Sequence, residues 1–342
     1  MRNQTKIIFS VLISLALAAW HNSPASIIPT PPMPANDTLA NNDIYLSGVY
    51  SVYMVPSTLK GTANNWIYID GQNKTTINGC LKIYGQYIVV QNLIVTGCTS
   101  HAVLVDNVTS DPLSGQYVWV QNVTVYHNGT VGATNWPSAL KCEQGASYVV
   151  FANNTVYENY GEGTAFTMCA YGWALNNNYR DNWSVSGVYA DNSDHIYVSG
   201  NYVTNTGMTG YTRNGKNYCF LVGAEDYTKY GWTNNHLATI YIQSNWLDNC
   251  KPISFWNPLG IASNDVQILD NISSGVTLPI SSVGTVIANV TGTPAARTST
   301  PVGATVTPTR PPATSTIPPL TSTPAPVPTV CEFSAHYMIC TK

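Results

Sequence analysis

A short segment of alternating apolar and polar residues recurs along most of the chain, and this repeat limits the folds open to it. Its copies are VVQNLIVTGC (89–98), WVQNVTVYHN (119–128), VFANNTVYEN (150–159), WALNNNYRDN (173–182), YVSGNYVTNT (197–206), YIQSNWLDNC (241–250) and QILDNISSGV (267–276). The second residues of successive copies, from Val90 to Ile268, lie 30, 31, 23, 24, 44 and 26 residues apart. Such a unit with insertions predicts a solenoid, in which each unit buries its apolar face against its neighbours.

The local pattern indicates strands. β-Branched and aromatic residues alternate with polar ones, and Asn- and Gly-rich turns separate the short runs. We expect two or three strands per coil, stacked in parallel about 4.8 Å apart. The second residue of each copy should point inward, as should the residue five positions later (Val95 to Ser273). Stacked asparagines are expected to bond along the axis in two columns: Asn92, Asn122, Asn153 and Asn176, and Asn128, Asn159 and Asn182.

The N-terminal residues resemble an export signal. Arg2 and Lys6 precede an apolar run, Ile7 to Ala19, and small residues at 16–18 or 23–25 could mark cleavage. We therefore predict a signal peptide at 1–25, a lead-in at 26–44 and a protein that is secreted or held at the cell surface. An uncleaved anchor is the alternative.

The C-terminal region changes composition abruptly. Residues 292–330 are rich in Thr, Pro, Ser and Ala, which is typical of an extended linker or stalk. In the tail at 331–342, Cys331 and Cys340 are expected to close a small loop. This end could attach the protein to the cell envelope, or it could be a disordered tail with one disulfide.

Charge and motifs exclude some partners. Only 9% of residues are charged and the net charge is −3, so no basic patch indicates nucleic acid as a partner. No CxxC or HExxH motif occurs, which argues against zinc. We predict no certain cofactor, with Ca²⁺ left open.

Several segments resemble a known repeat: IYIDGQNKTTINGCLKIYGQYIVVQNLIVTG (67–97), NNTVYENYGEG (153–163), YADNSDHIYVSGNYV (189–203) and IYIQSNWLDN (240–249). Together they resemble the right-handed parallel β-helix of the pectate-lyase-like superfamily. The resemblance implies an all-β, right-handed parallel β-helix over residues 45–291. That superfamily includes polysaccharide lyases, glycoside hydrolases, epimerases, phage tailspikes and non-enzymatic surface proteins. The Arg-x-Pro-x-x-Arg of pectate lyases and the catalytic set of polygalacturonases are both absent.

Acidic residues follow one predicted strand of several coils, at Asp106, Glu143, Asp191 and Glu225. Carboxylates on neighbouring coils would lie about 5 Å apart, and on alternate coils about 10 Å apart. This spacing suits acid–base catalysis at a glycosidic bond or a Ca²⁺ site. Each acid could instead cap its own turn.

Glu162 stands between Gly161 and Gly163, which should leave its carboxylate uncovered. We therefore predict a catalytic site formed by Glu162, Asp191 and Glu225. Glu158, four residues earlier, is expected to be a solvated turn residue.

Basic and aromatic residues could contact a substrate. Two long segments of the 44-residue coil contain Arg213, Lys216, Tyr218 and Trp232, and further candidates are Arg180 and His195. His195 could be a turn residue or a general base. The leading hypothesis is an exported protein that binds and cleaves an extracellular polysaccharide by hydrolysis or β-elimination. The alternative is a non-catalytic surface or adhesion protein carried on the stalk.

The cysteines are interpreted as disulfide cross-links between neighbouring coils. In the register of the repeat, three pairs fall on consecutive coils: Cys80–Cys98, Cys142–Cys169 and Cys219–Cys250.

Overall fold

The computed structural model describes residues 26–34, 43–132, 136–205, 218–228, 231, 237–256, 264–269, 271–274, 285–287, 290–291, 330–334 and 337–341. The predicted signal peptide and nearly all of the Thr/Pro-rich segment lie outside these residues. The chain divides into two units, Met1–Pro294 and Ala295–Lys342. Within the described ranges, no helix is long and apolar enough to cross a membrane.

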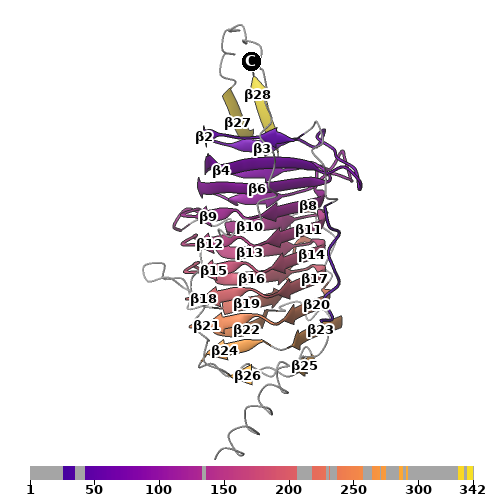
Figure 1. Ribbon diagram of the computed structural model, residues 1–342, viewed down its shortest axis with the longest axis vertical. Coiled ribbons are helices and arrows are strands. Elements are labelled where there is room, and N and C mark those ends of the chain that lie inside the picture. The colour runs from indigo at the N-terminus through magenta and orange to yellow at the C-terminus, as the bar shows by residue number, and fades with distance from the viewer. Residues whose placement is uncertain are drawn as a thin grey trace, which may run out of the picture. The chain divides into compact units, whose positions relative to one another are not determined.

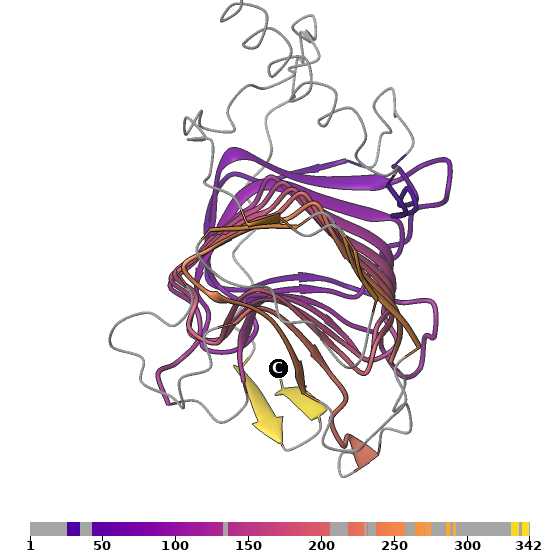
Figure 2. The ribbon, with the colours of Figure 1, turned by 90° about the horizontal axis from the view of Figure 1, so that it is seen from below.

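The first unit is a parallel β-helix. Its strands stack coil upon coil, and the view along the axis shows them overlapping around a shared interior (Figures 1 and 2). The described strands form three columns. The first two columns make one sheet because β4 (Ile67–Gly79) and β6 (Ile88–Gly97) run through both.

Besides β4 and β6, the first column contains β1 (Ile44–Tyr45), β8 (Gln116–Gln121), β11 (Ser147–Ala152), β14 (Ala170–Leu175), β17 (Asp194–Ser199), β20 (Ala238–Gln243), β23 (Asn264–Leu269) and β25 (Thr285–Ile287). The second column adds β2 (Gly48–Tyr50), β9 (Thr124–Tyr126), β12 (Thr155–Tyr157), β15 (Asn178–Arg180), β18 (Tyr202–Thr204), β21 (Trp246–Asp248), β24 (Ile272–Ser274) and β26 (Val290–Thr291). The third column is a separate sheet of β3 (Tyr53–Val55), β5 (Leu81–Ile83), β7 (Val103–Val105), β10 (Ser138–Glu143), β13 (Glu162–Thr167), β16 (Val185–Asp191), β19 (Tyr218–Gly223) and β22 (Lys251–Trp256).

The predicted register is confirmed. The second residues of the repeat pair from coil to coil along the first column, as Val90 with Val120 and Val120 with Phe151. The pairing continues without a break to Ile268. The residues five positions later pair in the same way along the second column, from Val95 to Ser273. Both rows are buried, so they form the interior of the solenoid.

The three predicted disulfides are present within the first unit. Cys80–Cys98, Cys142–Cys169 and Cys219–Cys250 have Cα–Cα distances of 4.8, 6.1 and 5.5 Å. Five of these six cysteines belong to the buried core, and Cys80 packs against it. The bonds therefore join consecutive coils from inside the solenoid.

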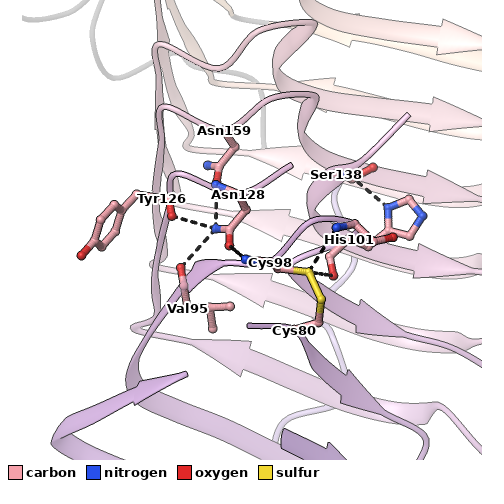
Figure 3. Close-up of a disulfide and its surroundings, with 9 residues drawn as sticks. Cys80, Val95, Cys98, His101, Tyr126, Asn128, Ser138 and Asn159 are labelled. Atoms are coloured by element: carbon pink, nitrogen blue, oxygen red, sulfur yellow. Dashed lines mark hydrogen bonds between the residues drawn. A yellow bond between two sulfur atoms is a disulfide. The ribbon is translucent and has the colours of Figure 1, made fainter. Parts of the chain in front are cut away.

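One predicted asparagine column is correct. Asn128 donates through Nδ2 to Asn159 Oδ1 at 2.9 Å, and Asn159 donates to Asn182 Oδ1 at 2.9 Å. Figure 3 shows the start of this ladder beside Cys80–Cys98, where Asn128 Oδ1 also accepts the Cys98 N–H at 2.9 Å. The ladder fixes the turn between the second and third columns.

The other predicted column is displaced by one residue. The bonded ladder consists of Asn154, Asn177, Asn201, Asn245 and Asn271. Asn92, Asn122, Asn153 and Asn176 instead have φ values of 53° to 56°. Asparagine tolerates this left-handed conformation, so these residues make the turn that directs the next residue inward.

The described residues of the second unit are two antiparallel strands, β27 (Val330–Ser334) and β28 (Tyr337–Thr341). Cys331 lies directly opposite Cys340 in their register.

Candidate functional site on the third column

Charged and tyrosine side chains gather on the outer face of the third column. In β10, Leu140 and Cys142 belong to the buried core. Because side chains alternate along a strand, Lys141 and Glu143 face outward. The register places Asp106 next to Glu143 and aligns Glu143, Thr167 and Asp191 on successive coils. We call this surface the acid face. Its functional side chains are Asp106, Lys141, Glu143, Tyr189, Asp191, Glu225 and Tyr227. Glu162 is buried at the start of β13.

Asp191, the last residue of β16, is completely buried. Its Oδ2 accepts a hydrogen bond from the Tyr227 hydroxyl, whereas Oδ1 has no partner among the described residues. Burial raises the pKa of Asp191 to about 7, against the lowering effect of the Tyr227 hydrogen bond, and the Glu225 charge raises it further. Asp191 can therefore hold or release a proton near neutral pH.

Glu225 lies beside Asp191, in the segment that follows β19. Its Oε1 accepts the Tyr189 hydroxyl at 2.8 Å. Burial and the neighbouring carboxylates raise the pKa of Tyr189 well above its usual value, and the pKa of Tyr227 is raised for the same reasons. Both tyrosines are thus hydrogen-bond donors to the acids rather than bases.

Glu162, at the start of β13, is only 5% exposed, so the expectation of an uncovered carboxylate is wrong. Its Oε2 accepts the Ser138 hydroxyl at 3.0 Å. Position 161 requires glycine for a structural reason. Gly161 has φ 141°, and a Cβ there would collide with the carbonyl oxygen of Pro137 on the preceding coil. Burial raises the pKa of Glu162 to about 7, and the Lys141 charge opposes this rise.

Two of the three predicted catalytic acids each accept a hydrogen bond from one of a pair of tyrosines, and the third is linked to them through its charge. Asp191 and Glu225 share the tyrosine-bonded cluster, whereas Glu162 pairs with Ser138 in register and Asp191 with Thr167. Five residues of strand, about 17 Å, therefore separate Glu162 from Asp191 along the chain direction. Glu162 remains linked to the cluster electrostatically, because the Glu225 charge contributes to raising its pKa.

A second group of charges lies on the earlier coils of the same face. Lys141 Nζ is 3.3 Å from Glu143 Oε1. Burial raises the pKa of Asp106 to about 7, and the Glu143 charge adds to this effect. Asp106, Glu143 and Asp191 of the predicted acid column therefore follow one register, whereas Gly223 pairs with Asp191 and Glu225 lies two residues beyond Gly223. The Lys141 charge acts on Asp106, Glu162 and Asp191.

Of the predicted substrate-binding residues that the structure describes, Arg180 and His195 lie on other columns and Tyr218 lies in the third column. Arg180 lies in the second column, with its guanidinium carbon 4.1 Å from the Tyr157 ring centroid and Nη1 3.2 Å from Asp181 Oδ2. His195 lies in the first column, where it ends a stack formed by Tyr87, Tyr117, Tyr148 and Tyr171. Its Nδ1 is 2.8 Å from Asp194 Oδ1. In the third column, Tyr218 stands near Lys251, whose Nζ is 5.6 Å from the ring centroid.

Arg213, Lys216 and Trp232 lie outside the described residues. Glu158 is a half-exposed turn residue with φ 53°, and its Oε2 is 2.7 Å from His127 Nε2 on the preceding coil. It thus lies at the surface turn where it was expected, in hydrogen-bond contact with the His127 ring.

The described part of the chain contains no group of three or more His, Cys, Asp or Glu side chains placed to hold a metal ion. The acid cluster is built differently, since each of its two carboxylates accepts a tyrosine hydroxyl.

Sequence reasoning missed the residues that hold the acids in place, namely Tyr189, Asn192 and Tyr227. One signal was available. Tyr189 lies two residues before Asp191 on the same strand, so period-2 alternation places both side chains on one face. Tyr227 follows a strand end and carries no such signal.

Comparison with protein-family models and with curated proteins gives no match. Among solved structures, the chain is similar to pectate lyase Pel9A, with 14% identity and a TM-score of 0.42 over 68% of this chain and 61% of that chain. It is also similar to DFA-IIIase from Arthrobacter chlorophenolicus A6, with 12% identity and a TM-score of 0.32 over 72% and 57% of the two chains. A mannuronic acid specific polysaccharide family 6 lyase from human gut microbiota gives 12% identity and a TM-score of 0.25 over 75% and 78%. The chain thus spans about three fifths of the length of the first two proteins, and the likeness is one of fold.

Proposed function

We propose that this protein is an exported enzyme that binds an extracellular polysaccharide on the acid face and cleaves it by acid–base catalysis. Asp191 and Glu225 are the acting carboxyl groups. The observation that carries the proposal is the state of Asp191: it is fully buried, one oxygen is bonded to Tyr227 and the other has no partner among the described residues. A buried carboxyl group with a strongly shifted pKa and a specific charged neighbour is a feature of catalytic sites.

The chemistry follows from two carboxyl groups in different environments. Asp191 is buried and its pKa is about 7, so a large fraction of it is protonated at neutral pH, which is the form that a general acid needs once substrate binding uncovers it. Glu225 is partly exposed, and as a carboxylate it can activate a water molecule or attack the anomeric carbon. The Tyr189 hydroxyl holds Glu225 in place for this role.

The charge balance of the acid face favours hydrolysis over β-elimination. β-Elimination acts on uronates, whose carboxylate needs a neutralising cation. Among the described residues of this face, Lys141 and Lys82 are the cations whose charges act on the acids, and Lys141 is already paired with Glu143. The surrounding carboxylates would repel a polyuronate. We therefore favour a substrate whose sugars are neutral.

The repeat of the scaffold supports a polymeric substrate. Successive coils lie about 4.8 Å apart, so an extended chain along the axis would meet side chains of the same face at each coil. Polar residues extend over this face from Asp106 on β7's coil to Glu225 after β19. Subsites on both sides of the acting acids would follow from this arrangement.

The test is a panel of neutral and uronate polysaccharides, with new reducing ends and 4,5-unsaturated ends measured separately, with and without chelator. We expect reducing ends alone, from a neutral substrate, and no effect of chelator. Asp191→Asn and Glu225→Gln should each abolish cleavage and keep the fold. Unsaturated ends would show a lyase instead.

Two further variants complete the panel. Glu162→Gln should reduce the rate less than Asp191→Asn does, because Glu162 lies apart from the pair. Glu158→Gln, at a surface turn, is the matched control and should cleave like the wild type. If no polysaccharide is cleaved but one is bound, the non-catalytic surface protein becomes the better description.

A further inference from the structure

Residues 26–34, SIIPTPPMP, follow the outer face of the first column across several coils. In Figure 1 they form the indigo trace that passes β8, β11, β14, β17 and β20. Four of the nine residues are proline. We call this segment the strap.

Polar contacts attach the strap at three places. The Trp119 indole N–H donates to the Pro32 carbonyl oxygen at 3.0 Å, and the Trp173 indole N–H donates to the Pro29 carbonyl oxygen at 3.0 Å. At the third place, Gln243 Oε1 accepts the Ile27 N–H at 3.2 Å and the Ser26 hydroxyl at 3.4 Å.

These contacts have a common period. The attached residues 32, 29 and 26 are three apart, and their partners lie on β8, β14 and β20, which are two coils apart in the first column. A polyproline II helix has three residues per turn and rises about 9.3 Å per turn. Two coils of a parallel β-helix measure about 9.6 Å. One turn of polyproline II therefore matches two coils, although the chain bends at Ile28.

The surface under the strap is a row of outward-facing residues in register. Between β8 and β20 it consists of Trp119, Val150, Trp173, Tyr197 and Tyr241. Val150 has no exposed surface although it lies on the outer face, and Ile28 packs into this cluster. We call these five residues the stripe.

Proline suits such a surface for a second reason. Its backbone has no N–H, so a proline-rich segment places few unpaired donors on apolar residues. Its carbonyl oxygens remain, and they satisfy the buried indole N–H groups. Docking of an extended proline-rich segment on an aromatic-lined groove is a known mode of peptide recognition.

We propose that the stripe is a binding groove for a polyproline II peptide and that the strap is its built-in, separable ligand. The proposal is independent of the function assigned to the acid face, which lies on another column.

The test lets the chain fold before the strap is cut free. A specific protease site is placed within residues 35–42 of the full chain, and the folded protein is then cleaved there. We expect the cut strap to co-elute with the β-helix in gel filtration at micromolar concentration. An excess of synthetic SIIPTPPMP should exchange with it, whereas a peptide with alanine at each proline should not.

The double variant Trp119→Phe and Trp173→Phe keeps the aromatic packing and removes both indole donors. It should weaken strap binding by about tenfold or more, as expected for two lost hydrogen bonds. Trp183→Phe is the matched control, because its ring stacks on Tyr160 at 4.5 Å, away from the strap. Immediate loss of the cut strap from a β-helix that keeps its circular dichroism would overturn the proposal, as would equal binding in the double variant.

Discussion

The side-chain amide of Asn192 holds the main chain of Glu225 from both sides. Its Oδ1 accepts the Glu225 N–H at 2.6 Å, and its Nδ2 donates to the Glu225 carbonyl oxygen at 2.9 Å. The two residues are 33 positions apart, so this pair fixes the segment after β19 against the turn after β16. The carboxylate of Glu225 is placed by this attachment.

Asn192 should consequently matter for both rate and stability. Asn192→Gly removes the amide and accepts the positive φ of 46° without strain, whereas Asn192→Ala adds about 1 kcal/mol of strain to the same loss. Both variants should cleave substrate at least about tenfold more slowly, because Glu225 is no longer positioned. Urea unfolding should show the glycine variant as the more stable of the two. A glycine variant with the wild-type rate would show that Glu225 is positioned by other groups.

Three acids whose pKa values are raised by burial should make the protein less stable as pH rises from about 4 to about 7, whereas His101, whose pKa is lowered by burial, acts against this trend. Asp106, Glu162 and Asp191 each have a pKa of about 7 in the folded protein, above their usual values of 3.8 to 4.5. Between these values the folded state binds more protons than the unfolded state, so the free energy of unfolding falls with pH. The stabilisation from these groups is complete below about pH 4 and is lost as pH rises through 7.

Asp191→Asn should flatten this dependence, because it replaces a buried acid by a group that does not ionise. The thermal midpoints of variant and wild type should lie closest near pH 4. Toward pH 8 the midpoint of the variant should rise relative to that of the wild type. A parallel pair of profiles would mean that Asp191 is not protonated in the folded state.

The sequence predicted the coil register because the register is encoded locally. A buried residue at the second position of each repeat and another five positions later suffice to align neighbouring coils, and the pairs from Val90 to Ile268 follow that alignment. The sequence did not reveal which of two adjacent asparagines turns inward. In the pair Asn176–Asn177 this depends on the backbone conformation of the first residue, which has φ 54°.

The candidate site was predictable in outline only. Acids at strand ends fall on one face by register, as Asp191 does. The burial of Glu162 depends on Ser138 and Pro137 of the preceding coil, which are 24 and 25 residues earlier. The partnership of Asp191 with Tyr227 depends on the path of a segment that follows a different strand. Neither relation has a local signature.

Cys331 and Cys340 should be disulfide-bonded. They are directly opposite in the antiparallel pair β27–β28, where Cα atoms lie about 4.5 to 5.5 Å apart, within reach of a disulfide. Mass mapping of peptides without reduction should therefore find this bond besides the three in the β-helix. Alkylation of either cysteine in the unreduced, denatured protein would contradict it.

The inner asparagine ladder should be among the strongest polar contributions to stability. Asn177 is 1% exposed and donates through Nδ2 to the Phe151 carbonyl oxygen at 2.9 Å and to Asn201 Oδ1 at 3.1 Å. Its own Oδ1 accepts two hydrogen bonds from Asn154, one from the backbone N–H at 2.9 Å and one from Nδ2 at 3.0 Å. Asn177→Gly leaves these buried groups without partners and should lower the free energy of unfolding by about 3 to 5 kcal/mol.

The neighbouring residue provides the matched control for this prediction. Asn176 is exposed and its left-handed backbone suits glycine, so Asn176→Gly should change stability by less than about 0.5 kcal/mol. Asn177→Asp tests the direction of the bonds, since it replaces the donor Nδ2 by an oxygen that faces two acceptors, and it should destabilise at least as much as Asn177→Gly at pH 7. Denaturant unfolding of the three variants measures all three effects. If the two glycine variants unfolded at the same denaturant concentration, the stacked side-chain amides would not hold the coils together, and the buried apolar rows alone would account for the cohesion of the solenoid.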